Sequence, residues 1–137
     1  MLGLVGAGLT FTLFAAFLLC VGGVELAIAM GKWPTLLNPQ TAFSPGAFFD
    51  IGHLLTALLS IAFAIVTRKN VCRLIAWALA ACHVLGLAAC IYIPMSHNFE
   101  GTDPVPNWWS DMEIMIAVST IFAAISLTAL RARSSAP

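Results

Sequence analysis

Charged side chains are scarce in this sequence: 9% of its 137 residues are Asp, Glu, Lys or Arg, whereas 61% are hydrophobic. A water-soluble core of this size cannot bury so many apolar side chains, so an ordinary soluble domain is excluded. The few basic residues give no sign of a nucleic-acid-binding surface. The composition indicates that the lipid bilayer is part of the solvent of this chain.

Two further absences narrow the class of protein. The sequence lacks stretches of about ten residues that alternate polar and apolar side chains, which is the pattern of membrane β-barrel strands. Its four cysteines contain no Cys-x-x-Cys pair, so neither a disulfide framework nor a thiol redox site is indicated. Helices remain as the elements that satisfy their own backbone hydrogen bonds in lipid.

Four long apolar runs are present, each near the ~20 residues needed to cross the hydrocarbon. They cover residues 4–30, 47–66, 74–94 and 112–130. The first run is too long for the apolar part of a cleavable signal peptide, and no basic residue precedes it. We therefore predict an all-α, multi-pass integral membrane protein, a four-helix bundle that forms a single domain over residues 1–137.

Five of the six basic residues sort to one side of this predicted bundle, and Lys32 is the exception. Three of them cluster at 68–73, in the turn between the second and third runs, and two follow the fourth run at 131–133. Because cytoplasmic segments carry the excess of Lys and Arg, both termini and this turn are predicted to be cytoplasmic. The two longer connections, 31–44 and 95–111, then face outward.

Local signals mark the starts of two helices. Ser44 can cap the second helix, and Pro45 suits its first position. Ser110 and Glu113 match a capping box at the start of the fourth helix, in which the Glu113 carboxylate reaches back to the Ser110 amide. This interpretation gives Glu113 a structural role rather than a ligand role.

Small side chains recur every four residues along the third run, at Ala78, Cys82, Gly86 and Cys90. A stripe of this kind allows two membrane helices to approach each other closely. It is therefore a packing surface, either within the bundle or toward a partner protein.

Several ionisable residues interrupt the apolar runs. In an antiparallel helix pair, positions equally far from the connecting turn lie at one height, which brings His53 level with His83 and Glu25 level with Asp50. Asp50 and His53 share a helix face through their i, i+3 spacing. Because an ionisable group inside the membrane costs roughly 2.5 to 3.5 kcal/mol and normally faces the bundle interior, we predict that these four side chains converge in one column.

Three kinds of chemistry fit this column. His53, His83 and Asp50, with His97 from the outer loop, can bind a non-haem iron or a copper ion. A haem between the two histidines is a weaker alternative, since helices adjacent in sequence stand too close for a porphyrin. Without a metal, Glu25, Asp50 and His53 can act as catalytic acid and base or relay protons. The sequence has neither His-x-x-x-His nor Glu-x-x-His spacing, so the cofactor stays open.

The end of the third run reads I-Y-I-P-M-S-H-N-F, and a polar loop with P-N-W-W then leads into the last run. This pattern resembles the anthrone-oxygenase-like family of small four-helix membrane proteins, in which the third helix closes on a proline followed by an asparagine, and a tryptophan-containing segment precedes the last helix. Pro94, Asn98 and Trp108 or Trp109 occupy the matching places. The resemblance implies an oxidase or oxygenase that acts on a lipophilic, aromatic small molecule.

We therefore expect a membrane oxidoreductase or oxygenase whose outward-opening cavity is lined by Glu25, Asp50, His53 and His83, with the 95–111 loop as a lid. The alternative is an accessory or assembly subunit of a larger membrane complex, without catalysis of its own, that docks through the small-residue stripe and the tryptophan-containing loop. A homo-oligomer is compatible with the first hypothesis, whereas it counts against the accessory role. A small transporter is a third hypothesis, but it requires broken helices or a more polar lining.

Overall fold

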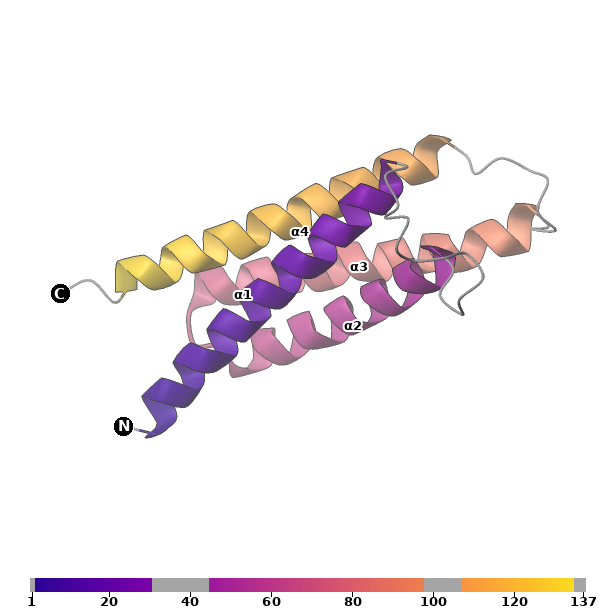
Figure 1. Cartoon of the computed structure of the whole chain (residues 1–137). Coiled ribbons are helices and arrows are strands. Elements are labelled where there is room, and N and C mark those ends of the chain that lie inside the picture. The colour runs from indigo at the N-terminus through magenta and orange to yellow at the C-terminus, as the bar shows by residue number, and fades with distance from the viewer. Residues whose placement is uncertain (1, 31–44, 98–106, 135–137) are drawn as a thin grey trace.

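Four long α-helices make up the computed structural model, which describes residues 2–30, 45–97 and 107–134 (Figure 1). They are α1 (Leu2–Ala29), α2 (Pro45–Val66), α3 (Asn70–His97) and α4 (Asn107–Ser134). All four helices are long and apolar enough to cross a membrane. The predicted all-α, multi-pass membrane fold is confirmed.

The helix starts follow the sequence signals at α2 but not at α4. α2 begins at Pro45, whose fixed φ and missing N–H suit the first helical position. α4 begins at Asn107, so Ser110 already lies inside the helix and cannot cap it. The predicted capping box is therefore wrong. The Glu113 side chain that it assigned to the helix end is buried in the bundle.

α3 is longer at both ends than its apolar run predicts. It begins at Asn70, whose side chain accepts a hydrogen bond from the Arg73 guanidinium. At its other end the helix continues past Pro94 to His97. Pro94 therefore does not end α3, although the sequence pattern predicts that it does.

The helices form two closely packed pairs, α2 with α3 and α1 with α4. α3 also contacts α4, whereas α1 and α2 meet over a short stretch. Both described ends of the chain lie at the same end of the bundle as the turn between α2 and α3 (Figure 1). The basic segments 68–73 and 131–133 are thus gathered at one end, while their cytoplasmic location stays a prediction.

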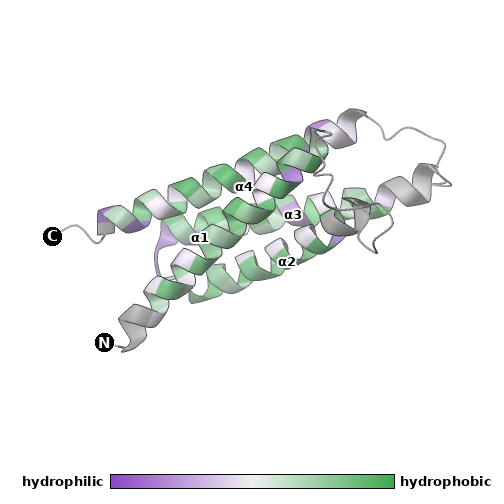
Figure 2. Ribbon diagram, viewed as in Figure 1, coloured by the Kyte–Doolittle hydropathy of each residue, from purple (hydrophilic) through white to green (hydrophobic). Residues whose placement is uncertain are grey.

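The outer surface of the bundle is apolar over the length of the helices. Figure 2 shows hydrophobic residues along the middle of all four helices and hydrophilic residues toward their ends. Large side chains such as Ile65, Leu85, Met115 and Phe122 are exposed on this surface. Lipid, rather than water, is the solvent in which such a surface is stable.

An apolar core fills the half of the bundle nearest the chain termini. Phe14 of α1 stacks on Phe63 of α2 with 4.5 Å between ring centroids, and Leu18 and Leu127 are fully buried beside them. In the other half of the bundle, polar side chains replace this packing. The interior is therefore divided along its length into an apolar part and a polar part.

Candidate functional site

Four ionisable side chains, one from each helix, meet in the polar half of the bundle. Glu25 of α1, His53 of α2, His83 of α3 and Glu113 of α4 are all 0% exposed. Three of them belong to the predicted column. The fourth, Glu113, takes the place in the cluster that the sequence analysis gave to Asp50.

Three ligand atoms of this cluster converge on one point. The Nδ1 atoms of His53 and His83 are 2.9 Å apart, and Glu25 Oε1 lies 3.4 Å from the first and 3.9 Å from the second. A point equidistant from the three atoms is about 2.0 Å from each of them, which is the length of a metal–nitrogen or metal–oxygen bond. The three side chains have the separation of ligands around one ion.

The second nitrogen of each histidine ring has its own partner. His53 Nε2 lies 3.0 and 3.1 Å from the two carboxylate oxygens of Glu113. His83 Nε2 lies 2.9 Å from Thr120 Oγ1, and the Thr120 hydroxyl is 2.8 Å from the Ile116 carbonyl oxygen. These contacts fix the orientation of both rings, so that both Nδ1 atoms face Glu25.

One arrangement of protons satisfies this chain of contacts without any net charge. A protonated Glu113 donates to His53 Nε2, and His53 Nδ1–H donates to His83 Nδ1. His83 Nε2–H then donates to Thr120, whose hydroxyl donates to the Ile116 carbonyl. The contacts thus form a continuous path for a proton between α4, α2 and α3.

Glu25 stands outside this hydrogen-bonded path. Both of its carboxylate oxygens are buried, and neither has a hydrogen-bond partner among the described residues. The 3.4 Å separation from His53 Nδ1 is within ion-pair distance but is not a hydrogen bond. A buried carboxylate without a partner is costly, and a cation bound by it removes that cost.

One face of α3 is shaped around the His53 ring. His83, Gly86 and Cys90 follow at i, i+3 and i+7, so they share this face. A Cβ atom at Gly86 would lie 2.7 Å from His53 Nε2, and only glycine leaves room for the ring. Cys90 Sγ lies 3.8 Å from Glu113 Oε1, which extends the cluster by a sulfur atom. Two members of the small-residue stripe are thus used inside the bundle.

Aromatic side chains cover the cluster on the side away from the apolar core. Phe49 lies 5.9 Å from the His53 ring and makes an edge contact with Trp109 at 5.1 Å. Phe49 is fully buried, and the Trp109 indole nitrogen is buried as well. These rings exclude water from the side of the cluster that they cover.

Of the other two predicted ligands, Asp50 and His97, Asp50 lies outside the cluster. Asp50 is exposed, because three residues turn an α-helix by 300° and leave it about 60° around the axis from the inward-facing His53. The side chain of His97, at the end of α3, is outside the described residues. The predicted lid and mouth likewise fall largely on residues 31–44 and 98–106, which lie outside the described ranges.

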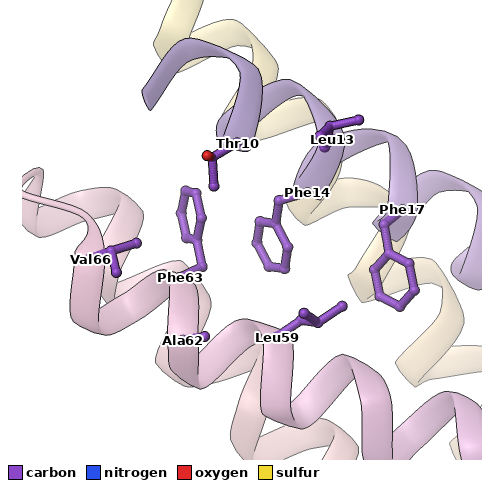
Figure 3. Close-up of a pocket in the computed structure, with 8 residues that line it drawn as sticks. All are labelled: Thr10, Leu13, Phe14, Phe17, Leu59, Ala62, Phe63 and Val66. Carbon is purple, nitrogen blue, oxygen red and sulfur yellow. The ribbon is translucent and has the colours of Figure 1, made fainter. Parts of the chain in front are cut away.

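An apolar groove lies between α1 and α2, beside the core rather than at the predicted outer mouth (Figure 3). Its volume is about 460 Å³, and its lining comes from two short stretches of helix. The lining residues are Thr10, Leu13, Phe14, Phe17, Leu59, Ala62, Phe63 and Val66. Leu59 is the lining residue of α2 that is closest in sequence to His53, and the separation of six positions between them corresponds to about 9 Å along the helix axis.

Comparisons with known proteins add no assignment to this site. No protein-family model, no curated protein and no solved structure matches the chain.

Proposed function

We propose that this chain is a membrane-embedded metalloprotein in which Glu25, His53 and His83 bind one transition-metal ion, and that the centre oxidises or oxygenates a lipophilic small molecule. The convergence of Glu25 Oε1 and two Nδ1 atoms on a point about 2.0 Å from each carries this proposal. Glu25, whose buried oxygens otherwise have no hydrogen-bond partner among the described residues, supports it independently.

The ligand set suits a redox-active ion. Two imidazoles and one carboxylate are the protein ligands of non-haem iron(II) oxygenases, which leave further positions on the ion open for co-substrates. Copper also accepts imidazole ligands. A haem suits this site poorly. Two histidine nitrogens that bind a haem iron from opposite faces would be about 4 Å apart, whereas the two Nδ1 atoms are 2.9 Å apart.

The surrounding groups match those of a metal-bound histidine. A histidine that ligates a metal through one nitrogen usually donates its other N–H to a carboxylate, a carbonyl or a similar acceptor. With an ion bound at Nδ1 and a proton on Nε2, the ionised Glu113 is this acceptor for His53, and Thr120 is the acceptor for His83. The carboxylates of Glu25 and Glu113 also balance the charge of a divalent ion, which matters because net charge inside the bilayer is costly.

The groove between α1 and α2 supports a lipophilic substrate. It is lined almost entirely by apolar side chains and lies within the membrane-spanning lengths of both helices. A substrate that partitions into the bilayer reaches it without crossing water. The resemblance of residues 91–109 to the anthrone-oxygenase-like family implies the same class of substrate and reaction.

Metal analysis of the purified protein tests the metal centre. The protein should contain at least one iron or copper ion per chain, and Glu25→Gln and His53→Ala should each lower the affinity for the ion at Glu25, His53 and His83 at least tenfold, because each removes a ligand atom. Asp50→Asn is the matched control: it makes the same carboxylate-to-amide change on an exposed side chain outside the cluster. Equal metal loss in Asp50→Asn and Glu25→Gln would contradict the assignment.

Oxygen uptake tests the reaction class. Metal-loaded protein in lipid nanodiscs should consume dioxygen when a lipophilic, electron-rich aromatic compound is added, and the Glu25→Gln protein should not. A metal-loaded protein that leaves a panel of such compounds and dioxygen unchanged would refute the oxidoreductase role but not the metal centre.

A metal-free proton relay is the second candidate function. The unbroken series of contacts from Glu113 through both histidines to Thr120, with separations of 2.8 to 3.1 Å, favours it. Carboxylates and histidines in series inside a membrane are typical of proton paths. Proton uptake by liposomes that contain the protein, abolished by His83→Ala while no metal is bound, would support the relay over the metal centre.

The role of an accessory subunit draws less support from the described contacts. It depended on the small-residue stripe of α3 as a docking surface, yet Gly86 packs on His53 and Cys90 lies beside Glu113. These residues serve packing within the chain. Co-purification of a stoichiometric partner in mild detergent would restore this alternative.

A further inference from the structure

The His53 ring presents its two nitrogens to two different sets of ligands. Nδ1 faces Glu25 and His83, and Nε2 faces Glu113, whose Oε1 lies 3.8 Å from Cys90 Sγ. Within each set, the ligand atoms all lie within 4.8 Å of one another. The two sets share only this ring, which stands between them.

We infer that the centre holds a second transition-metal ion, bound by His53 Nε2, Glu113 and Cys90, so that the His53 imidazole bridges two ions. This inference rests on the proposed function, because it takes the ion at Glu25, His53 and His83 as the first of the pair. A thiolate, an imidazole and a carboxylate together select a soft or borderline divalent ion such as zinc, iron, cobalt or copper.

The distances in the second set differ by a few tenths of an ångström from those of ligands around one ion. With bonds of about 2.0 to 2.2 Å to nitrogen and oxygen and about 2.3 Å to sulfur, tetrahedral ligands stand roughly 3.3 to 3.7 Å apart. The Glu113 oxygens lie 3.0 and 3.1 Å from His53 Nε2, and Glu113 Oε1 lies 3.8 Å from Cys90 Sγ. Shifts of a few tenths of an ångström suffice to place an ion among them.

The position of Cys90 follows from the shape of α3. Gly86 lets the His53 ring lie directly on this helix, and Cys90 follows one turn later on the same face. Glu113 approaches the same edge of the ring from α4. The second set therefore combines one residue from each of α2, α3 and α4, whereas the first set takes its third ligand from α1.

The ligands can neutralise the charge of two divalent ions inside the bilayer, as they can for one. A second divalent ion adds two positive charges, and the Cys90 thiolate and the deprotonated His53 imidazole supply two negative charges to match them. Ligands of a metal must be deprotonated, so binding itself removes these protons. Because His83 stays neutral, the loaded centre carries no net charge at a depth where net charge is costly.

Cobalt titration of the full-length protein, stripped with a chelator and held in nanodiscs, tests this inference. We expect two Co²⁺ per chain, and a thiolate-to-cobalt charge-transfer band in the near ultraviolet that rises with the second ion. Cys90→Ser should bind one Co²⁺ and lack the band. Cys82→Ser, a matched change at a half-buried cysteine of the same helix outside both sets, should bind two and keep it.

The outcomes separate this inference from the proposed function. One Co²⁺ per chain without a charge-transfer band would overturn the second ion and leave the first site intact. Absence of bound Co²⁺ would overturn both. Because the rise of the charge-transfer band with the second Co²⁺ is measured on the unmodified protein, the test does not depend on the Cys90→Ser protein folding.

Discussion

Replacement of Gly86 by alanine tests the arrangement of the cluster most directly. The new methyl carbon would lie 2.7 Å from Nε2, 2.8 Å from Cε1 and 3.0 Å from Cδ2 of the His53 ring. Ordinary contact begins near 3.4 Å, so the ring must move by about 0.7 Å. It cannot do so freely, since Nε2 is held by both Glu113 oxygens and Nδ1 faces His83.

Two consequences of the Gly86→Ala change have an expected size. Overpacking of this kind lowers the free energy of unfolding by about 1 to 3 kcal/mol. Displacement of the His53 ring from its ligand position should weaken the binding of one metal ion roughly 10- to 100-fold, as changes around a metal-bound histidine usually do. Titration of the chelator-stripped protein with Co²⁺ measures the second effect, and thermal unfolding in detergent measures the first.

Gly23→Ala is the matched control for this experiment. It is the same substitution in a membrane-spanning helix, at a position where an added Cβ meets nothing within 4 Å. Metal affinity and unfolding temperature should both stay close to those of the unmodified protein. If Gly86→Ala bound metal as tightly as Gly23→Ala does, the His53 ring would not lie against α3, and the argument for both metal sites would fail.

Three further substitutions have distinct expected outcomes. Glu113→Gln keeps the shape of the side chain but removes the carboxylate that orients His53, so metal affinity measured by titration should fall about 10- to 100-fold. Thr120→Val should weaken metal binding about tenfold, whereas Thr56→Val, a buried threonine without a hydrogen-bond partner in the described part of the chain, should leave it unchanged. Phe63→Ala should lower the free energy of unfolding by about 3 to 5 kcal/mol, because it leaves a cavity in the apolar core. Metal affinity should be retained, because Phe63 does not belong to the cluster. Equal effects of the two threonine changes, or loss of metal in Phe63→Ala protein that remains folded, would contradict the division of the bundle interior.

The sequence predicts three of the four members of the cluster because depth in a membrane helix can be counted from its ends. Residues at 1.5 Å per position on antiparallel neighbours have known relative heights, and His53 and His83 are indeed in contact. The direction in which a side chain points is not available from such counting. Asp50 has a suitable height and lies outside the cluster, because it is rotated about 60° around α2 from His53, which is enough to expose it.

Glu113 shows why the remaining ligands were missed. Its Ser-x-x-Glu context predicts a helix cap, and the apolar run that follows places the helix start at the same point. α4 instead begins a turn earlier, which moves Glu113 from the helix end into the bundle. A carboxylate inside a membrane-spanning segment was the available signal, and the more common capping role obscured it.

The sequence by itself determines that the lipid bilayer surrounds this protein and how many times the chain crosses it. These follow from composition and run length, since each backbone segment in lipid must satisfy its own hydrogen bonds as a helix. The tertiary structure decides which helices are neighbours and how each is rotated. Only that rotation brings Glu113 and Cys90 to the second nitrogen of His53, because contacts between helices depend on packing that no single segment encodes.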